Sequence, residues 1–252
     1  MFHYTIICFL LIFSFYLSFS LETIDLSWDL NNETIYVAGM QKFNFSKQVA
    51  STSQRGYWYS FKEFCVAEHG GTHFDAPYHF HQSGWKVGDV PLSRLFAKGA
   101  FLNMEEEHLK MGRDTRLKVK DLENWETRNG KFSENSVLLV KFGRSKFWQN
   151  RTLYLDLEGE TMHFPGLSKE AAQWIANSKK IIGVGVDTPS IDPGNSTDYI
   201  AHRILAENSL YNLENVKLLT DLPETGFDLV VAPMKIEEGT GAAVRIFAIV
   251  NN

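Results

Sequence analysis

Half of the eight histidines of this 252-residue chain lie in one short segment, from His69 to His81, and an aspartate stands among them. Neutral imidazole and carboxylate are the usual ligands of catalytic zinc and similar divalent ions. A single histidine is more often a hydrogen-bonded core or surface residue than a ligand, but several ligand-type side chains at regular spacing shift that balance. The segment therefore predicts a metal-dependent catalytic site.

The spacing within this segment favours an extended backbone. His69 and His73 stand four residues apart and would share a face of a helix, but two glycines follow His69 and Pro77 follows soon after, and these residues oppose a helix. In an extended chain His69, His73 and Asp75 point to the same face. The glycines permit a bend that brings His69 back toward the other two. We predict a three-ligand cradle that leaves coordination positions for water and substrate.

Two more histidines follow the cradle. Pro77 ends the predicted strand and lets the chain turn before His79, whose ordinary pKa suits a residue that transfers a proton near neutral pH. His81 lies beyond Phe80 and outside the pattern. We interpret His81 as a surface histidine or one that supports a ligand.

The elements that must position these residues can be read from the rest of the chain. Strands are expected at residues 57–66, 137–143 and 181–186, with two final strands at 228–236 and 242–250 joined as a hairpin. Helices are expected at 118–128 and at 169–176, the second with Ser168 as its N-cap. The fold class is therefore α/β: a single compact domain, residues 21–252, with a mixed β-sheet core and a few flanking helices.

The first 20 residues form a separate unit. They contain no Lys, Arg, Asp or Glu, carry a long apolar run and end in Ser18-Phe19-Ser20, which indicates a cleaved secretory signal peptide; an uncleaved anchor is the alternative. Four Asn-x-Ser/Thr sequons support export and glycosylation. We expect a secreted or secretory-pathway glycoprotein. The candidate acceptors are Asn32, Asn44, Asn150 and Asn195.

Composition excludes several other classes of protein. The formal net charge is only -5 and there is no basic stripe, which argues against a nucleic-acid partner. No second apolar run reaches membrane length, so no membrane association is expected after signal cleavage. Cys8 leaves with the signal peptide and Cys65 remains alone, so an internal disulfide is excluded. We expect Cys65, between Phe64 and Val66, to be a buried structural thiol.

The histidine segment also resembles a known family. His69, Thr72, His73, Asp75, Pro77, His79 and Phe80 stand as in the signature of the cyclase / kynurenine formamidase family of metal-dependent hydrolases, which includes the isatin hydrolases. The similarity extends from about residue 21 to 250. The resemblance implies a cyclase-like swivelling β/β/α fold and a homo-oligomer. Further matching segments are residues 164–168, 183–192, 201–203, 213–215 and 232–235.

The resemblance implies a complete site. His69, His73 and Asp75 correspond to the ligands of a first metal, and Asp75, His202 and Glu214 to those of a second ion in two-metal members. His79 corresponds to the histidine that acts on the proton of the attacking water. Without the resemblance His202 and Glu214 would pass as ordinary surface residues. The implied cofactor is zinc or manganese, one ion or two.

The implied reaction is metal-assisted hydrolysis of a small aryl formamide or cyclic amide. The first expectation for the substrate is N-formyl-L-kynurenine, giving L-kynurenine and formate in tryptophan catabolism. The chain has no Gly-x-Ser-x-Gly elbow, so a serine hydrolase route is not supported. An isatin-type or other cyclic-amide hydrolase is the alternative within the class. A secreted, catalytically silent binding protein is the alternative outside it, although every motif position is filled.

Two features leave their roles open. Asp187 and Asp192 flank the end of a predicted buried strand, where they could shape a pocket or hold a turn. Seven aromatic residues cluster near the histidines in sequence, and some of them could line an aryl-binding pocket. They are Trp58, Tyr59, Phe61, Phe74, Tyr78, Phe80 and Trp85.

Overall fold

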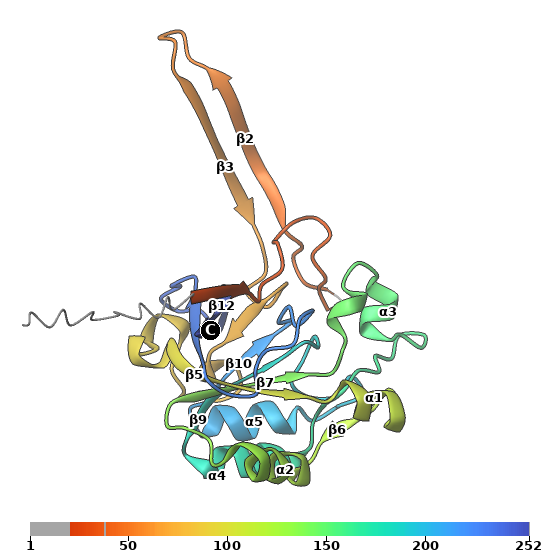
Figure 1. The fold of residues 1–252 in the computed structure, drawn as a ribbon. Coiled ribbons are helices and arrows are strands. Elements are labelled where there is room, and N and C mark those ends of the chain that lie inside the picture. Colours follow the sequence, from red (N-terminus) through yellow and green to blue (C-terminus); the bar gives the residue numbers. More distant parts are fainter. Residues whose placement is uncertain (1–20, 38, 252) are drawn as a thin grey trace, which may run out of the picture.

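The computed structural model describes residues 21–37 and 39–251, and a sheet that closes on itself lies at its centre (Figure 1). The order is β1-β12-β11-β5-β7-β9-β10-β4, and β4 also pairs with β12. The predicted signal peptide, residues 1–20, lies outside the described residues. The strands are β1 (Leu21–Asp25), β4 (His73–Asp75), β5 (Phe96–Asn103), β7 (Ser136–Lys141), β9 (Ile181–Val186), β10 (Tyr211–Glu214), β11 (Phe227–Pro233) and β12 (Gly241–Asn251).

The sheet is mixed, as the sequence predicts. β5, β7, β9 and β10 run parallel to one another, whereas β11, β12 and β4 join by antiparallel pairing. β7 and β9 are buried along their whole length, because helices cover one face and the interior of the closed sheet lies on the other. That burial explains their unbroken apolar sequences. The predicted final hairpin is confirmed by the pairing of β11 with β12.

Helices cover one side of this sheet (Figure 1). Ser168 caps α4 by accepting a hydrogen bond from the Ala171 amide at 3.1 Å, as predicted. Trp125 of α2 stacks on Phe132 at 4.1 Å within the apolar layer between helices and sheet. The helices are α1 (Glu105–Met111), α2 (Val119–Asn129), α3 (Arg151–Leu155), α4 (Lys169–Ser178) and α5 (Ile200–Glu207), with short 3-10 turns η1 (Pro77–His79), η2 (Val87–Asp89), η3 (Leu92–Arg94) and η4 (Ser145–Phe147).

A second apolar cluster takes its residues from strands all around the closed sheet, among them Phe74, Leu139 and Leu213, and fills its interior. A small parallel pair, β6 (Arg116–Leu117) and β8 (Gly166–Leu167), lies apart from the main sheet. No helix in the described part of the chain combines the length and apolar character needed to cross a membrane.

A long hairpin projects from the body of the molecule (Figure 1). It consists of β2 (Asn44–Thr52) paired with β3 (Trp58–Cys65), and we call it the arm. The predicted strand at 57–66 exists, but it belongs to the arm and not to the core. Trp58 is 66% exposed and Cys65 is exposed as well. The expectation of a buried Cys65 is therefore wrong, because the strand that carries it packs against no core.

Candidate metal centre and substrate pocket

The site is built on β4, which lies between β10 and β12 in the closed sheet. Phe74, its middle residue, is fully buried and packs on Tyr211 with ring centroids 4.7 Å apart. Because side chains alternate along a strand, His73 and Asp75 face the other way, out of the sheet interior. Both are nearly inaccessible to solvent, and His73 Nε2 lies 3.3 Å from Asp75 Oδ1.

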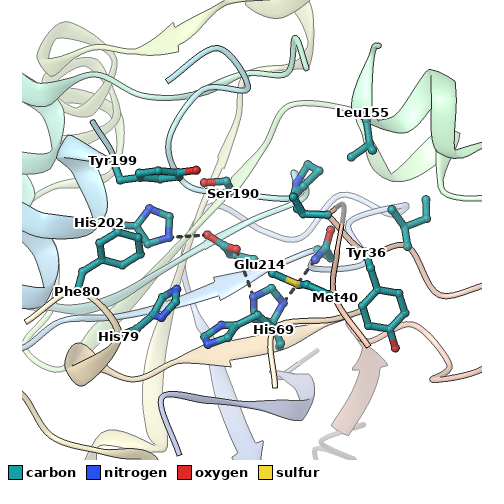
Figure 2. Close-up of a pocket in the computed structure, with 15 residues that line it drawn as sticks. Tyr36, Met40, His69, His79, Phe80, Leu155, Ser190, Tyr199, His202 and Glu214 are labelled. Carbon is teal, nitrogen blue, oxygen red and sulfur yellow. Dashed lines mark hydrogen bonds and ion pairs between the residues drawn. The ribbon is translucent and has the colours of Figure 1, made fainter. Parts of the chain in front are cut away.

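Two further ligand-type side chains reach the same point from distant segments (Figure 2). Glu214 lies directly opposite His73 in the register of β10 with β4, and its Oε2 is 3.3 Å from His73 Nε2. His202 projects from α5 and places its Nε2 3.0 Å from Glu214 Oε1 and 3.3 Å from Asp75 Oδ2. The structure therefore brings His73, Asp75, His202 and Glu214 together, although almost 130 residues of sequence separate the first two from the last two.

His69 and His79 stand beside this group. Gly71, with φ +62, supplies the bend expected after His69, whose Nδ1 lies 2.8 Å from Asp75 Oδ1 and whose Nε2 lies 2.8 Å from Thr240 Oγ1. His79 follows the turn at Pro77 and stacks on the His69 ring at 3.9 Å. Each of the six predicted site residues thus lies at one centre.

The buried carboxylates set the charge of this centre. Burial by itself lowers the pKa of His73, but hydrogen bonding and attraction to Asp75 and Glu214 outweigh it and raise that pKa to about 10. Burial opposes ionisation of Asp75 too, yet its three histidine neighbours hold its pKa well below the usual range. Burial lowers the pKa of His79 to about 4, so that imidazole is neutral at neutral pH. Two ionised carboxylates here attract positive charge, which protonated His73 supplies without a metal and which a divalent cation would supply by displacing that proton.

A divalent cation fits the donor atoms present. Asp75 Oδ2 is buried without a hydrogen-bond partner, although such atoms are rarely left unsatisfied. Two sets of three residues each bring their ligand atoms within 4.8 Å of one another. One set is His69, Asp75 and His79, and the other is His73, Asp75 and Glu214. Asp75 belongs to both groups, as the resemblance implies for a shared carboxylate. The structure groups His73 with Glu214 rather than with His69, so the division of ligands between two ions remains a prediction.

Asp192 fixes the orientation of His202. Its Oδ2 accepts hydrogen bonds from His202 Nδ1 at 2.7 Å and from the His202 amide at 3.0 Å, and its Oδ1 accepts one from the Ala201 amide at 2.9 Å. With Nδ1–H donated to Asp192, Nε2 faces Asp75 and Glu214, and its lone pair would bind a cation there once Nε2 has lost its proton. Asp187 has a structural role away from the ligands. Its carboxylate accepts hydrogen bonds from the backbone N–H groups of residues 142, 144 and 145 and so holds that loop in place.

Substitution Asp192→Asn is expected to weaken metal binding about 10- to 100-fold, the usual effect of removing the partner that orients a ligating histidine. The amide can still accept backbone N–H groups, so the start of α5 should persist. Calorimetric titration of the metal-free protein measures the affinity, and circular dichroism checks the fold. Asp198→Asn, an exposed change in the same segment, is the control. Wild-type affinity in Asp192→Asn would show that Asp192 does not orient a ligand.

A pocket of about 260 Å³ opens onto this centre (Figure 2). Of the seven aromatics near the motif in sequence, only Phe80 lines it; Trp58 and Tyr59 are exposed on the arm and Phe74 is in the core. Two lining aromatics escaped the sequence analysis. Tyr36 comes from the segment before the arm, and Tyr199 precedes α5 and faces Phe80 at 5.5 Å.

Comparisons with known proteins find relatives of this chain both in sequence and in fold. A family model described as "Putative cyclase" matches residues 24–193. An isatin hydrolase of Roseibium aggregatum is 26% identical, covering 81% of this chain and 80% of that protein, and a kynurenine formamidase of Bacillus cytotoxicus is 27% identical, covering 89% and 95%. Isatin hydrolase A from Labrenzia aggregata, solved bound to benzyl benzoate, superposes with a TM-score of 0.84 at 26% identity, covering 92% of this chain and 94% of that one.

Proposed function

Because this chain belongs to the cyclase family and its relatives include an isatin hydrolase and kynurenine formamidases, we propose that it hydrolyses the C–N bond of an aryl formamide or a cyclic amide. The observation that carries the proposal is the convergence of His73, His202, Asp75 and Glu214 at the floor of an aromatic-lined pocket. A catalytically silent binding protein is not supported, since the matched relatives are named hydrolases and each predicted site position holds a ligand-type or proton-transferring side chain.

Two substrates follow from the relatives. The kynurenine formamidase suggests N-formyl-L-kynurenine, which would yield L-kynurenine and formate in tryptophan catabolism. The isatin hydrolase suggests the cyclic amide isatin. Both reactions add water to an amide carbonyl and break its bond to a nitrogen carried by an aromatic ring, which becomes an aryl amine, so one site can serve either. The proposed cofactor is zinc or manganese, as one ion or two, held by His69, His73, Asp75, His202 and Glu214.

The residues suggest how the reaction proceeds. A divalent ion held by His69, His73, Asp75, His202 and Glu214 would lower the pKa of bound water toward ~7 and would polarise the substrate carbonyl. The neutral His79 imidazole accepts a proton from the attacking water while the water oxygen bonds to the carbonyl carbon. When the C–N bond breaks, His79 returns that proton to the leaving nitrogen, so the histidine ends unchanged. Phe80 and Tyr199 hold the aryl ring beside the reacting carbonyl.

The experiment that tests this function is hydrolysis of both substrates by the purified mature chain before and after chelation. We expect chelation to remove activity and zinc or manganese to restore it, because the proposed mechanism needs the metal as well as the proton acceptor at the substrate carbonyl. Activity that survives complete metal removal would contradict the mechanism. A folded, metal-loaded protein that hydrolyses neither substrate nor any related amide would contradict the function.

We also propose that the protein is a homo-oligomer and that the arm takes part in the contact. A two-stranded hairpin is marginally stable on its own, and its open edges readily pair with another chain. The arm exposes Tyr57, Trp58 and Tyr59 near its tip. Light scattering on the mature protein should give a mass at least twice that of one chain, and a monomer would contradict this proposal.

Secretion and glycosylation are proposed on the sequence features alone. The four sequon asparagines, Asn32, Asn44, Asn150 and Asn195, are exposed, which is compatible with glycan attachment. Expression in a eukaryotic secretory host should give a protein in the medium whose mass falls on treatment with a glycan-removing amidase. Retention in the cell with unchanged mass would contradict both proposals.

A further inference from the structure

The substrate pocket is unusual in how few charges it offers away from the metal centre. We infer that the enzyme selects substrates whose aryl part carries no charge, so that neutral aryl formamides and lactams are hydrolysed in preference to zwitterionic amino acids such as N-formyl-L-kynurenine. The inference rests on the proposed amide hydrolase activity and decides between its two classes of substrate.

Apart from the histidines, most residues that line the pocket are apolar or aromatic. Ile35, Val37, Met40, Leu155 and Pro189 line the pocket together with the rings of Tyr36, Phe80 and Tyr199 (Figure 2). No lysine or arginine is among the lining residues of the described chain, and its one carboxylate, Glu214, already contacts His73, His202 and the Ile191 amide. Residues 1–20 and residue 38 contain no lysine or arginine either, so these segments cannot add a cationic side chain.

Several polar groups of the pocket already take part in hydrogen bonds within the chain. Asn215 donates its amide to the Gly71 carbonyl at 2.8 Å and accepts the Tyr154 hydroxyl at 2.8 Å. The Tyr36 hydroxyl accepts a hydrogen bond from the Phe43 amide at 3.1 Å, and the Ser190 hydroxyl accepts one from the Asp192 amide at 3.1 Å. A substrate carboxylate placed away from the metal centre would meet hydroxyl groups but no lysine or arginine among the described lining residues.

The cation behind this wall is not available to a substrate. Arg144 donates to the carbonyls of Leu153 and Tyr154, which precede the lining residue Leu155, and it is only 5% exposed. A carboxylate and an ammonium group taken from water into this part of the pocket would therefore lose hydration without gaining an oppositely charged partner, which is costly for charged groups. A neutral ring loses nothing comparable and gains apolar contact.

The test compares two substrates with the same reacting group. N-formyl-L-kynurenine and 2′-formamidoacetophenone share the ring, the ketone and the formamide, and only the first carries the charged amino-acid part. We expect kcat/KM for the neutral compound to be at least about tenfold higher, because an unpaired buried charge disfavours the other. An equal or higher value for N-formyl-L-kynurenine would overturn the inference and leave the hydrolase function standing. Failure to hydrolyse both compounds, and isatin too, would overturn both.

A matched pair of variants tests the physical cause. Met40 lines the pocket, is 38% exposed and can be replaced by a long side chain without filling the core. Met40→Lys offers a cation to a substrate carboxylate, whereas Met40→Gln has similar bulk and no charge. We expect the kcat/KM ratio of charged to neutral substrate to be about fivefold or more higher in Met40→Lys than in Met40→Gln, and to fall with added salt. The same ratio in both variants would overturn the claim that missing charge in this wall sets the preference.

Discussion

Replacing Asp75 with alanine is expected to abolish both metal binding and hydrolysis. Its two oxygens reach His69, His73 and His202, and Oδ2 has no hydrogen-bond partner of its own. A bound ion supplies several kcal/mol of transition-state stabilisation and about 1.4 kcal/mol corresponds to a factor of ten, so kcat/KM should fall by at least ~10³-fold. Elemental analysis of the dialysed protein and the hydrolysis assay measure the two losses.

Asp114→Ala is the matched control for this variant. Asp114 also pairs with a histidine, His163 at 3.1 Å, but in a different part of the molecule. We expect Asp114→Ala to keep metal and activity, because this half-buried pair contains none of the candidate ligands. Thermal unfolding should confirm that Asp75→Ala remains folded. A folded Asp75→Ala protein with a full complement of metal would contradict the assignment of Asp75 as a shared ligand.

Replacing His79 with alanine should separate catalysis from metal binding. We expect the variant to retain metal and to lose about 10²- to 10⁴-fold in kcat, the usual contribution of a proton-transferring side chain. The structure makes this prediction sharper, because His79 also falls within reach of His69 and Asp75 as a possible ligand. Metal content and turnover, measured on the same preparation, distinguish the two roles.

The control for His79 is its neighbour in the same segment. His81→Ala should change neither metal content nor turnover, since His81 lines no part of the pocket as described. Partial rescue of His79→Ala by added imidazole would support a role in proton transfer. Loss of metal in His79→Ala to the extent seen in Asp75→Ala would show that His79 is a ligand and would remove it from the proposed proton transfer.

The sequence predicted those parts of the fold and site whose signals are local. The buried strands β7 and β9, the cap at Ser168 and the pairing of β11 with β12 followed from apolar runs and turn residues. The placement of His73 and Asp75 on one face followed from parity in an extended chain, and His69 reaches Asp75 through the bend at the glycines, but the predicted three-ligand cradle stays a prediction. Each of these predictions depends on residues only a few positions apart.

The other half of the site could not be derived in that way. His202 and Glu214 reach the centre only because α5 packs beside the sheet and β10 pairs with β4, and local patterns do not specify such long-range pairing. They were predicted by resemblance alone. The pocket walls show the same limit, since Tyr36 and Tyr199 come from segments on opposite sides of the motif. For Cys65 the apolar neighbours suggested burial, but the hairpin that carries it leaves the body of the protein.

Substitutions in the arm and in the core are expected to differ in their effect on folding and catalysis. A substitution in β4 changes the packing of Phe74 or the ligand cluster. It therefore alters the folding free energy or the catalytic rate directly. Most arm side chains are exposed and their printed contacts are mainly with one another, and exposed substitutions of this kind usually alter folding free energy by no more than about 0.5 kcal/mol. If Trp58 or Tyr59 is under evolutionary constraint, that constraint would therefore reflect contact with another molecule and not the requirements of folding.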